Sequence, residues 1–328
     1  MIKKLPLILF IFTFRFSIFN SASAQITFQK TLVDNVSFSY SSAASIQPCS
    51  DGGYIIGGTY RFLLGNEANS YLVKTDQYGD TLWTRIYRDQ DSMGIITSAQ
   101  QVADGGYICA GWIFDFEYGY CWSLRKTDGN GDTQWIKYFR GVAGTSRAMS
   151  VIVTRDGGYA IAGYFDELAA GLVKLDASGN ILWGRQYVRN DASQVLMTLC
   201  VKQTDDDGFI LAGMTPDDPL FLHAPVLIKV DSNGGIEWAK TYKYIEGWAN
   251  SVCIASDGGF VMVGIIGDTL SLGEICLLKT GSDGSVQWCK AIGGSQRDWA
   301  AHISRTSDNG FLIAGISNSF SFGTFNYF

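Results

Sequence analysis

Residues 51–60 read Asp-Gly-Gly-Tyr-Ile-Ile-Gly-Gly-Thr-Tyr, a tight-turn sequence followed by an apolar run, and close copies of this stretch recur along the chain. Successive copies are separated by 53, 52, 51, 50 and 51 residues. A constant period of this length is typical of repeat architectures, in which each repeat forms one supersecondary unit. The six copies begin at Asp51, Asp104, Asp156, Asp207, Asp257 and Asp308.

A second marker lies between the copies of the first. In the first unit it consists of Lys74, Asp76, Gly79 and Trp83, and the spacing of nine residues from Lys to Trp is the same in every copy. In the first four copies the residues at alternate positions after the Trp are a cation and an aromatic, which share one face of a strand. We interpret this face as packing between units rather than as a ligand ladder. The other copies begin at Lys126, Lys174, Lys229 and Lys279.

Each unit contains four short strand-like runs, which in the first unit are residues 43–48, 54–60, 70–75 and 81–87. The first two runs are joined by Asp-Gly-Gly and the last two by an Asp-x-x-Gly turn. Asp and Gly favour tight hairpins, and hairpins this short join only antiparallel neighbours. One four-stranded antiparallel meander per unit is typical of a propeller blade. No stretch has a helical apolar period of helical length.

The sequence therefore predicts an all-β fold, a six-bladed β-propeller of four-stranded antiparallel blades that occupies residues 25–328 as one domain. The last unit supplies a first strand at 300–304, a second at 311–316 and a short third at 324–328. Residues 26–30 match the fourth strand of the other units. We expect this N-terminal strand to pair with the last blade and close the ring, which removes open sheet edges.

Residues 1–24 read as a signal peptide. Lys3 and Lys4 precede an apolar core at residues 5–14, and Ser21-Ala22-Ser23-Ala24 forms a small-residue cleavage site. An uncleaved membrane anchor is the alternative. We expect a protein that is secreted or held at the cell surface or in the periplasm of a Gram-negative bacterium, with no integral membrane segment after cleavage.

Composition and net charge exclude some classes of structure and function for this protein. The chain has 38 Gly, 5 Pro and 17% charged residues, which suits many short strands and turns and argues against disorder. Its net charge is −6, and losing Lys3, Lys4 and Arg15 with the leader takes it to −9. Because an acidic protein repels polyanions, we expect no nucleic-acid partner.

The seven cysteines fit no disulfide framework, since their number is odd and their spacing is irregular. We expect buried free thiols, with Cys276 and Cys289 as one candidate pair because they flank a hairpin turn. No Cys/His spacing indicates zinc, and Asp205-Asp206-Asp207-Gly208 aligns with an ordinary turn rather than a calcium loop. We therefore expect neither a metal site nor a cofactor.

The repeats resemble the β-propeller repeats of secreted proteins of Bacteroidetes-type bacteria. Residues 293–300, Gly-Gly-Ser-Gln-Arg-Asp-Trp-Ala, followed by Asp308-Asn309-Gly310-Phe311, are the copy nearest to that family's pattern. The resemblance covers essentially the whole mature chain and implies an extracytoplasmic propeller, but it implies little about activity. The Asp…Gly…Trp turn is also locally similar to quinoprotein propeller repeats. An adjacent cysteine pair and a cofactor constellation are both absent, however, so we do not infer a quinone-dependent dehydrogenase.

A catalytic set is not recognisable in the sequence. His223 and His302 are the two histidines, and no Gly-x-Ser-x-Gly elbow accompanies them. The connections between the second and third strands differ sharply from unit to unit, and binding residues favour such loops. Several combine aromatic rings with carboxylates, which suits sugar or protein ligands. The ligand-binding candidates are Trp112, Phe114, Asp115, Glu117, Tyr118, Tyr164, Asp166, Glu167, Asp217 and Asp218.

The leading hypothesis is a non-enzymatic, monomeric extracytoplasmic propeller that binds a protein or a glycan through its variable loop face. One alternative is a polysaccharide-active enzyme that uses loop carboxylates such as Asp166 or Glu167. The other is a structural module truncated from a larger surface protein, because the chain stops inside the third strand of the last unit.

Overall fold

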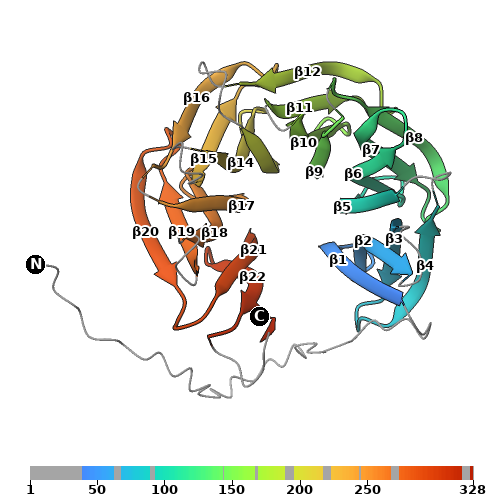
Figure 1. The fold of residues 1–328 in the computed structure, drawn as a ribbon, viewed down its shortest axis with the longest axis horizontal. Coiled ribbons are helices and arrows are strands. Elements are labelled where there is room, and N and C mark those ends of the chain that lie inside the picture. Colours follow the sequence, from blue (N-terminus) through green and yellow to red (C-terminus); the bar gives the residue numbers. More distant parts are fainter. Residues whose placement is uncertain are drawn as a thin grey trace, which may run out of the picture.

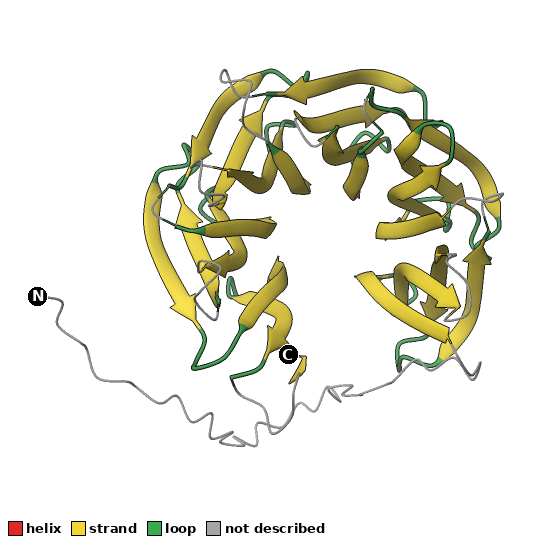
Figure 2. Ribbon diagram, in the orientation of Figure 1, coloured by secondary structure: helices red, strands yellow, loops and turns green. Residues whose placement is uncertain are grey.

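A computed structural model gives the fold of the chain, and within the described residues its regular structure consists of β-strands (Figure 2). These residues include no helix long and apolar enough to cross a membrane. The described residues are 39–62, 68–88, 93–142, 144–166, 169–188, 196–216, 223–243, 245–266, 273–319 and 326–327.

The described strands form six antiparallel sheets, each built from strands that are consecutive in the chain. Sheet 1 contains β1 (Ser39–Pro48), β2 (Tyr54–Phe62), β3 (Ala68–Thr75) and β4 (Thr81–Tyr87). Sheet 2 contains β5 (Met93–Gln101), β6 (Tyr107–Asp115), β7 (Gly119–Thr127) and β8 (Thr133–Phe139). Sheet 3 contains β9 (Arg147–Val153), β10 (Tyr159–Phe165), β11 (Ala169–Leu175) and β12 (Ile181–Tyr187).

The remaining three sheets repeat the pattern, and the last is shorter in its described part. Sheet 4 contains β13 (Met197–Gln203), β14 (Phe209–Pro216), β15 (His223–Val230) and β16 (Ile236–Thr241). Sheet 5 contains β17 (Gly247–Ile254), β18 (Phe260–Ile266), β19 (Glu274–Thr280) and β20 (Val286–Ile292). Sheet 6 contains β21 (Asp298–Arg305), β22 (Phe311–Ser317) and β23 (Asn326–Tyr327).

The sheets stand around a common axis, as Figure 1 shows. The first strand of each sheet lies innermost, and in sheets 1 to 5 the fourth lies outermost, so that β5, β9 and β17 face the axis. Sheets 1 and 6 form the two ends of this arrangement (Figure 1). The prediction of repeated four-stranded antiparallel sheets is confirmed, whereas the predicted closing strand at residues 26–30 lies outside the described residues.

Sheets pack face to face through their second strands. The residue after the aromatic that opens this strand is 0% exposed in each of sheets 1 to 5. In sheet 1 this residue is Ile55, which lies in one apolar cluster with Tyr107 and Cys109 of sheet 2 and therefore points to the next sheet. Burial between sheets is the main source of stability in such a fold. The five residues are Ile55, Ile108, Ala160, Ile210 and Val261.

The Trp of each fourth strand also packs against the next sheet. Trp83 meets the ring of Tyr107 edge-on at 5.7 Å, and Tyr87 on the same strand donates a hydrogen bond to the carbonyl of Gly131 at 2.7 Å. The cation between them, Arg85, lies 5.8 Å from the Trp83 ring and pairs with Asp132 of sheet 2. The interpretation of this face as packing between units is therefore confirmed.

The marker of the fourth unit begins one residue earlier than the sequence alignment placed it. Asp206, not Asp207, accepts the hydrogen bond from the second glycine of the turn and pairs with the lysine of the unit. Asp207 has φ 62° and occupies the position that Gly52 occupies with φ 82° in the first unit. The predicted start at Asp207 was wrong because this residue was matched to the first Asp of the other markers. Asp207 in fact stands where four of the other units have a glycine with positive φ.

The seven cysteines are unbonded, and six of them are buried. Cys276 and Cys289 are diagonal rather than directly opposite, since Cys276 pairs with Ala291 and Cys289 pairs with Leu278. Their sulfur atoms are 3.9 Å apart. Diagonal Cα atoms on neighbouring strands are typically about 7–8 Å apart, which is too far for an unstrained disulfide.

Candidate functional site

The propeller has two ends that differ in their connections. We call the end with the hairpins between first and second strands, and between third and fourth strands, the turn end. We call the opposite end, which holds the connections between second and third strands and between successive sheets, the loop end. Of the five variable connections, the one in sheet 2 between Trp112 and Tyr120 is described in full.

A buried lysine and a partly exposed aspartate form an ion pair at the turn end of sheets 1 to 5. The nitrogen-to-oxygen distances are 2.7–2.8 Å, the lysine side chains are 4–7% exposed and the aspartates 52–57%. These residues come from the two sequence markers, which therefore bind each other across the sheet. The pairs are Lys74–Asp51, Lys126–Asp104, Lys174–Asp156, Lys229–Asp206 and Lys279–Asp257.

Asp156 illustrates the electrostatics of these pairs. Burial acts to raise its pKa, but hydrogen bonds from Lys174, Thr154 and the backbone of Gly158 outweigh burial and lower the pKa to about 2. The Lys174 ammonium also donates to the carbonyl of Leu175. Both charges are thus satisfied within the fold, and they are not available to bind a ligand.

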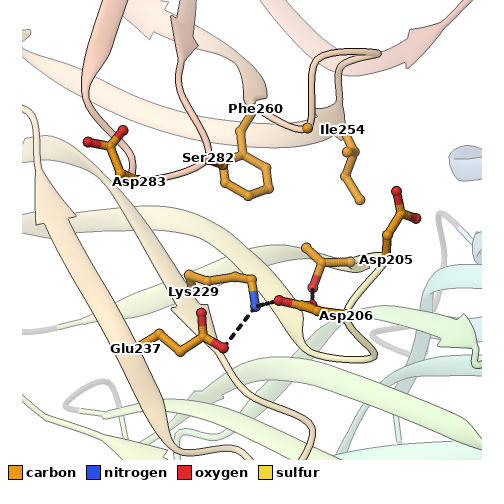
Figure 3. Close-up of a pocket in the computed structure, with 10 residues that line it drawn as sticks. Asp205, Asp206, Lys229, Glu237, Ile254, Phe260, Ser282 and Asp283 are labelled. Carbon is orange, nitrogen blue, oxygen red and sulfur yellow. Dashed lines mark hydrogen bonds and ion pairs between the residues drawn. The ribbon is translucent and has the colours of Figure 1, made fainter.

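A pocket of about 400 Å³ lies at the turn end between sheets 4 and 5 (Figure 3). Its lysine, Lys229, is held by Asp206 at 2.8 Å and by Glu237 at 3.3 Å, as the dashed lines in Figure 3 show. Asp205 and Asp283 also line the pocket, so its polar lining is mainly anionic. Among the described residues there is no group of three or more His, Cys, Asp or Glu side chains arranged to hold a metal ion.

The aromatic candidates of sheet 2 gather at the loop end. Trp112 and Phe114 at the end of β6 both contact the ring of Tyr120 at the start of β7, with centroid distances of 5.1 and 5.0 Å. Phe116, which the candidate set omitted, contacts Phe114 at 5.5 Å and is 78% exposed. Tyr118 is 43% exposed. The cluster thus presents ring surfaces to solvent.

Two arginines that the candidate set omitted complete this cluster. The Arg140 guanidinium lies 3.9 Å from the Tyr118 ring centroid and 3.5 Å from the Asp115 carboxylate. Arg147 at the start of β9 lies over both Trp112 and Tyr120, at 5.0 and 4.8 Å. A cation this close to an aromatic face is attracted by the ring quadrupole.

The described candidate carboxylates hold the loops in place. Asp115 accepts hydrogen bonds from the backbone of Glu117 and Tyr118, which closes their turn. Asp166 accepts from the backbone of Val142 at 2.7 Å and from the hydroxyl of Ser146.

The other candidates are placed as follows. Tyr164 is 6% exposed and is directed into the protein, with its carbonyl accepting from Trp122. Glu117 is exposed beside Tyr118, and its carboxylate raises the pKa of that phenol. Glu167, Asp217 and Asp218 lie outside the described residues.

Three buried side-chain nitrogens in the described part of the chain have no hydrogen-bond partner, and all three are at the loop end. They belong to residues that open a third strand or a first strand. Buried polar groups without partners are rare in folded proteins, and each requires an explanation. The atoms are Asn69 Nδ2, Arg147 Nε and His223 Nδ1.

Comparisons with known proteins support the fold alone. The chain matches no protein-family model and no curated protein. Solved structures that it resembles include Sqt1 of Chaetomium thermophilum, with 14% identity, coverage of 88% of this chain and 69% of that chain, and a TM-score of 0.50. The subtype N10 neuraminidase-like protein of A/little yellow-shouldered bat/Guatemala gives 10% identity, 84% and 90% coverage, and a TM-score of 0.50.

A protein of unknown function from Bacteroides caccae is a further structural neighbour. It gives 14% identity, 77% and 82% coverage, and a TM-score of 0.47. Together with the sheet topology, the two likenesses with a TM-score of 0.50 support a β-propeller repeat fold. They say nothing of activity, since unrelated functions share such scaffolds.

Proposed function

We propose that this protein is a non-enzymatic, extracytoplasmic β-propeller that binds a glycan or a protein through the loop end of sheets 2 and 3. The single observation that carries the proposal is the contrast between the two ends. At the turn end the buried charges are paired, whereas at the loop end of sheets 2 and 3 the buried Nε of Arg147 lacks a partner in the cluster that carries the exposed rings of Phe116 and Tyr118. A ligand with a hydrogen-bond acceptor would satisfy this nitrogen and cover these rings.

The binding function is favoured over hydrolysis by the positions of the loop acids. Both described carboxylates of the cluster, Asp115 and Asp166, already accept hydrogen bonds from loop backbone. A carboxylate that holds a loop in place is poorly suited to act as a nucleophile or a general base. The proposal includes a monomeric protein without a nucleic-acid partner, as the negative net charge suggests.

Phe116 provides the test of the site. Its ring is 78% exposed, so Phe116→Ala is expected to leave stability unchanged. The matched control is Leu82→Ala, because Leu82 is 58% exposed on the outermost strand β4, away from the loop end. We expect a ligand found by a screen of glycans and envelope proteins to lose about tenfold in affinity with Phe116→Ala and none with Leu82→Ala. Equal losses, or no ligand at all, would count against the site.

Export is part of the same proposal. The leader-like residues 1–24 and the resemblance of the repeats to secreted Bacteroidetes-type propellers support a protein that is secreted or retained at the cell surface or in the periplasm. The intact mass of the protein recovered from its natural compartment tests the cleavage site, since the expected chain begins at Gln25.

We further propose that the ring has six blades and closes between sheets 6 and 1. Leu312 of β22 is 65% exposed, although its five equivalents in sheets 1 to 5 are 0% exposed. Ile46 of β1 is 58% exposed, although its equivalents in the other sheets are 0–3% exposed. The two residues point to opposite sides of their sheets, so docking sheet 6 onto sheet 1 would bury both. The equivalents of Ile46 are Ala99, Val151, Val201, Val252 and Ile303.

A charge placed at Ile46 tests this closure. If Ile46 is buried against sheet 6 in solution, Ile46→Asp should destabilise the protein by about 3 kcal/mol, because the carboxylate would be buried without a partner. Leu82→Asp, at a residue with the same 58% exposure on an outer strand, should cost little. Equal unfolding midpoints for the two variants would argue that the ring stays open.

A further inference from the structure

We propose that Arg147 is the anion-recognition residue of this site, and that its ligand is a glycan whose terminal sugar carries a carboxylate. The inference rests on the proposed function and names the ligand class. The guanidinium lies in the corner between two rings that are nearly perpendicular, Trp112 and Tyr120, whose interplanar angle is 85°. Its in-plane N–H groups are the donors that remain for a ligand.

No carboxylate within the described residues pairs with Arg147, and its buried Nε has no acceptor. The nearby acids are committed elsewhere. Asp115 lies 3.5 Å from Arg140 and caps its own turn, and Asp166 holds Val142 and Ser146. A partly buried cation without a counter-ion is unfavourable, so a ligand anion would relieve a cost that the fold carries.

The fold itself does not need an arginine at this position. Residue 147 lies three positions before Ser150, whose hydroxyl accepts from the backbone of Val201 in the next sheet. The equivalent residue before Ser98 in sheet 2 is Ile95, and the equivalent of Tyr120 in sheet 1 is Ala68. Aliphatic residues therefore suffice between sheets 1 and 2. Between sheets 4 and 5 the equivalent residues, His223 and Trp248, make a contact between rings at 6.2 Å. The arginine over two rings is therefore particular to sheets 2 and 3, and a ligand explains it best.

The loops around Arg147 are rigid enough to act as a prepared site. The backbone of Tyr120 donates to the carbonyl of Gly144 at 2.6 Å, and the backbone of Ser146 donates to the carbonyl of Tyr120 at 3.1 Å. These bonds join the start of β7 to the connection between β8 and β9. Asp166, which directly follows β10, accepts a further hydrogen bond from the same connection at Val142. A site that is already ordered loses less entropy when it binds.

A carboxylate matches these donors because arginine binds planar carboxylates with two parallel hydrogen bonds. A sugar is favoured over an acidic peptide because Phe116 and Tyr118 offer exposed ring faces rather than an apolar pocket for a side chain. A single carboxylate is favoured over a dense polyanion because the protein is itself acidic, with a net charge of −6. The ligand class is therefore a glycan that ends in a uronic acid.

The experiment compares a disaccharide that ends in glucuronic acid with the same disaccharide ending in glucose. Binding is measured by calorimetry to the wild-type protein, to Arg147→Met and to Arg147→Lys. We expect the wild type to prefer the acidic sugar by about 10- to 100-fold, because a hydrogen bond between charged groups contributes that much discrimination. Arg147→Met should abolish the preference, and Arg147→Lys should keep part of it.

Arg185→Met is the matched control. Arg185 also lies over a tryptophan, 5.7 Å from the Trp183 ring centroid, but on the outermost strand of sheet 3. Its loss should leave the preference intact. If the two sugars bound with equal affinity and Phe116→Ala lowered that affinity, the proposal that Arg147 recognises an anion would be wrong, whereas the proposed binding site would be supported. Binding of a short glutamate peptide in place of either sugar would overturn the glycan class, and no binding of any probe would overturn both proposals.

Discussion

The turn end and the loop end are made by the same strands, yet they treat polar groups in opposite ways. At the turn end, five sheets repeat one lysine–aspartate pair, and each lysine is 4–7% exposed and fully partnered. At the loop end, Arg147 and His223 present buried nitrogens without partners. The difference teaches that the buried lysine–aspartate pairs keep the sequence of the turn end nearly the same in these five sheets, whereas the sequence of the loop end is free to vary.

The constraint arises because a buried ammonium needs an anion close by. Leaving it unpaired costs several kcal/mol, so the Lys and the Asp of a unit are tied to each other. The connection between second and third strands that is described in full, residues 112–120 of sheet 2, contains no lysine to be paired in this way. The sequence of this connection can therefore change from sheet to sheet, and the position of Trp112 is Thr59 in sheet 1, Tyr164 in sheet 3 and Ile265 in sheet 5.

The largest effect that we predict concerns the packing of the turn end against the next sheet. Gly179 has φ 78°, and a Cβ there would lie 2.8 Å from the Trp135 ring of sheet 2. Gly157 has φ 79°, but a Cβ there would meet nothing within 4 Å. Gly157→Ala should cost about 1 kcal/mol from backbone strain alone. Gly179→Ala should cost about 3 kcal/mol, because the ring must also move.

Urea denaturation of the two variants at neutral pH makes this measurement. The sequence contains its own control, since Asp207 occupies the position of Gly157 in the fourth sheet with φ 62°. Equal costs for the two glycines would mean that the turn end is not packed against its neighbour, and the comparison between the ends would lose its basis.

The turn end could be predicted from the sequence, whereas at the loop end the aromatic candidates of sheet 2 were predicted and the arginines that contact them were not. The strands 54–60 and 81–87 were predicted within two residues of β2 and β4, because hairpins depend on residues close in the chain. The first strand begins at Ser39 rather than at residue 43, since its serine-rich start has no alternating pattern. Arg147 was missed because its partner Tyr120 lies 27 residues away in another sheet. One signal was available in the sequence: residue 147 is an arginine, whereas the equivalent residue of the preceding unit is Ile95.

Acid should weaken the turn end through its aspartates. The folded protein lowers the pKa of Asp156 and of Asp206 from 3.8 to about 2, against the opposing effect of burial. A lowered pKa means that each carboxylate stabilises the fold above pH 3.8, and that this contribution is lost as the pH falls toward 2. Because both side chains are more than half exposed, we expect about 1 kcal/mol from each rather than the full electrostatic value.

Thermal unfolding measured between pH 5 and pH 2 checks the sign. Asp156→Asn should be less stable than the wild type at pH 5 and should lose less stability as the pH falls, and Asp206→Asn should behave in the same way. If Asp156→Asn lost as much stability as the wild type over this range, the pair would not carry the acid sensitivity of the turn end.

The smallest effect belongs to the loop end, where Arg147→Met should change the free energy of unfolding by no more than about 0.5 kcal/mol. The buried Nε of Arg147 has no hydrogen-bond partner within the described residues, and Met retains much of the side chain's contact with Trp112 and Tyr120. Arg125 is the matched residue that serves the fold. It is 7% exposed, lies 4.2 Å from the Tyr87 ring centroid and donates to Thr133 at 2.6 Å. Arg125→Met should therefore cost about 2 kcal/mol. These results would show that Arg125 is needed for stability and Arg147 for binding. A large loss of stability in Arg147→Met would instead mean that Arg147 stabilises the fold, and there would then be no reason to seek an anion beside it.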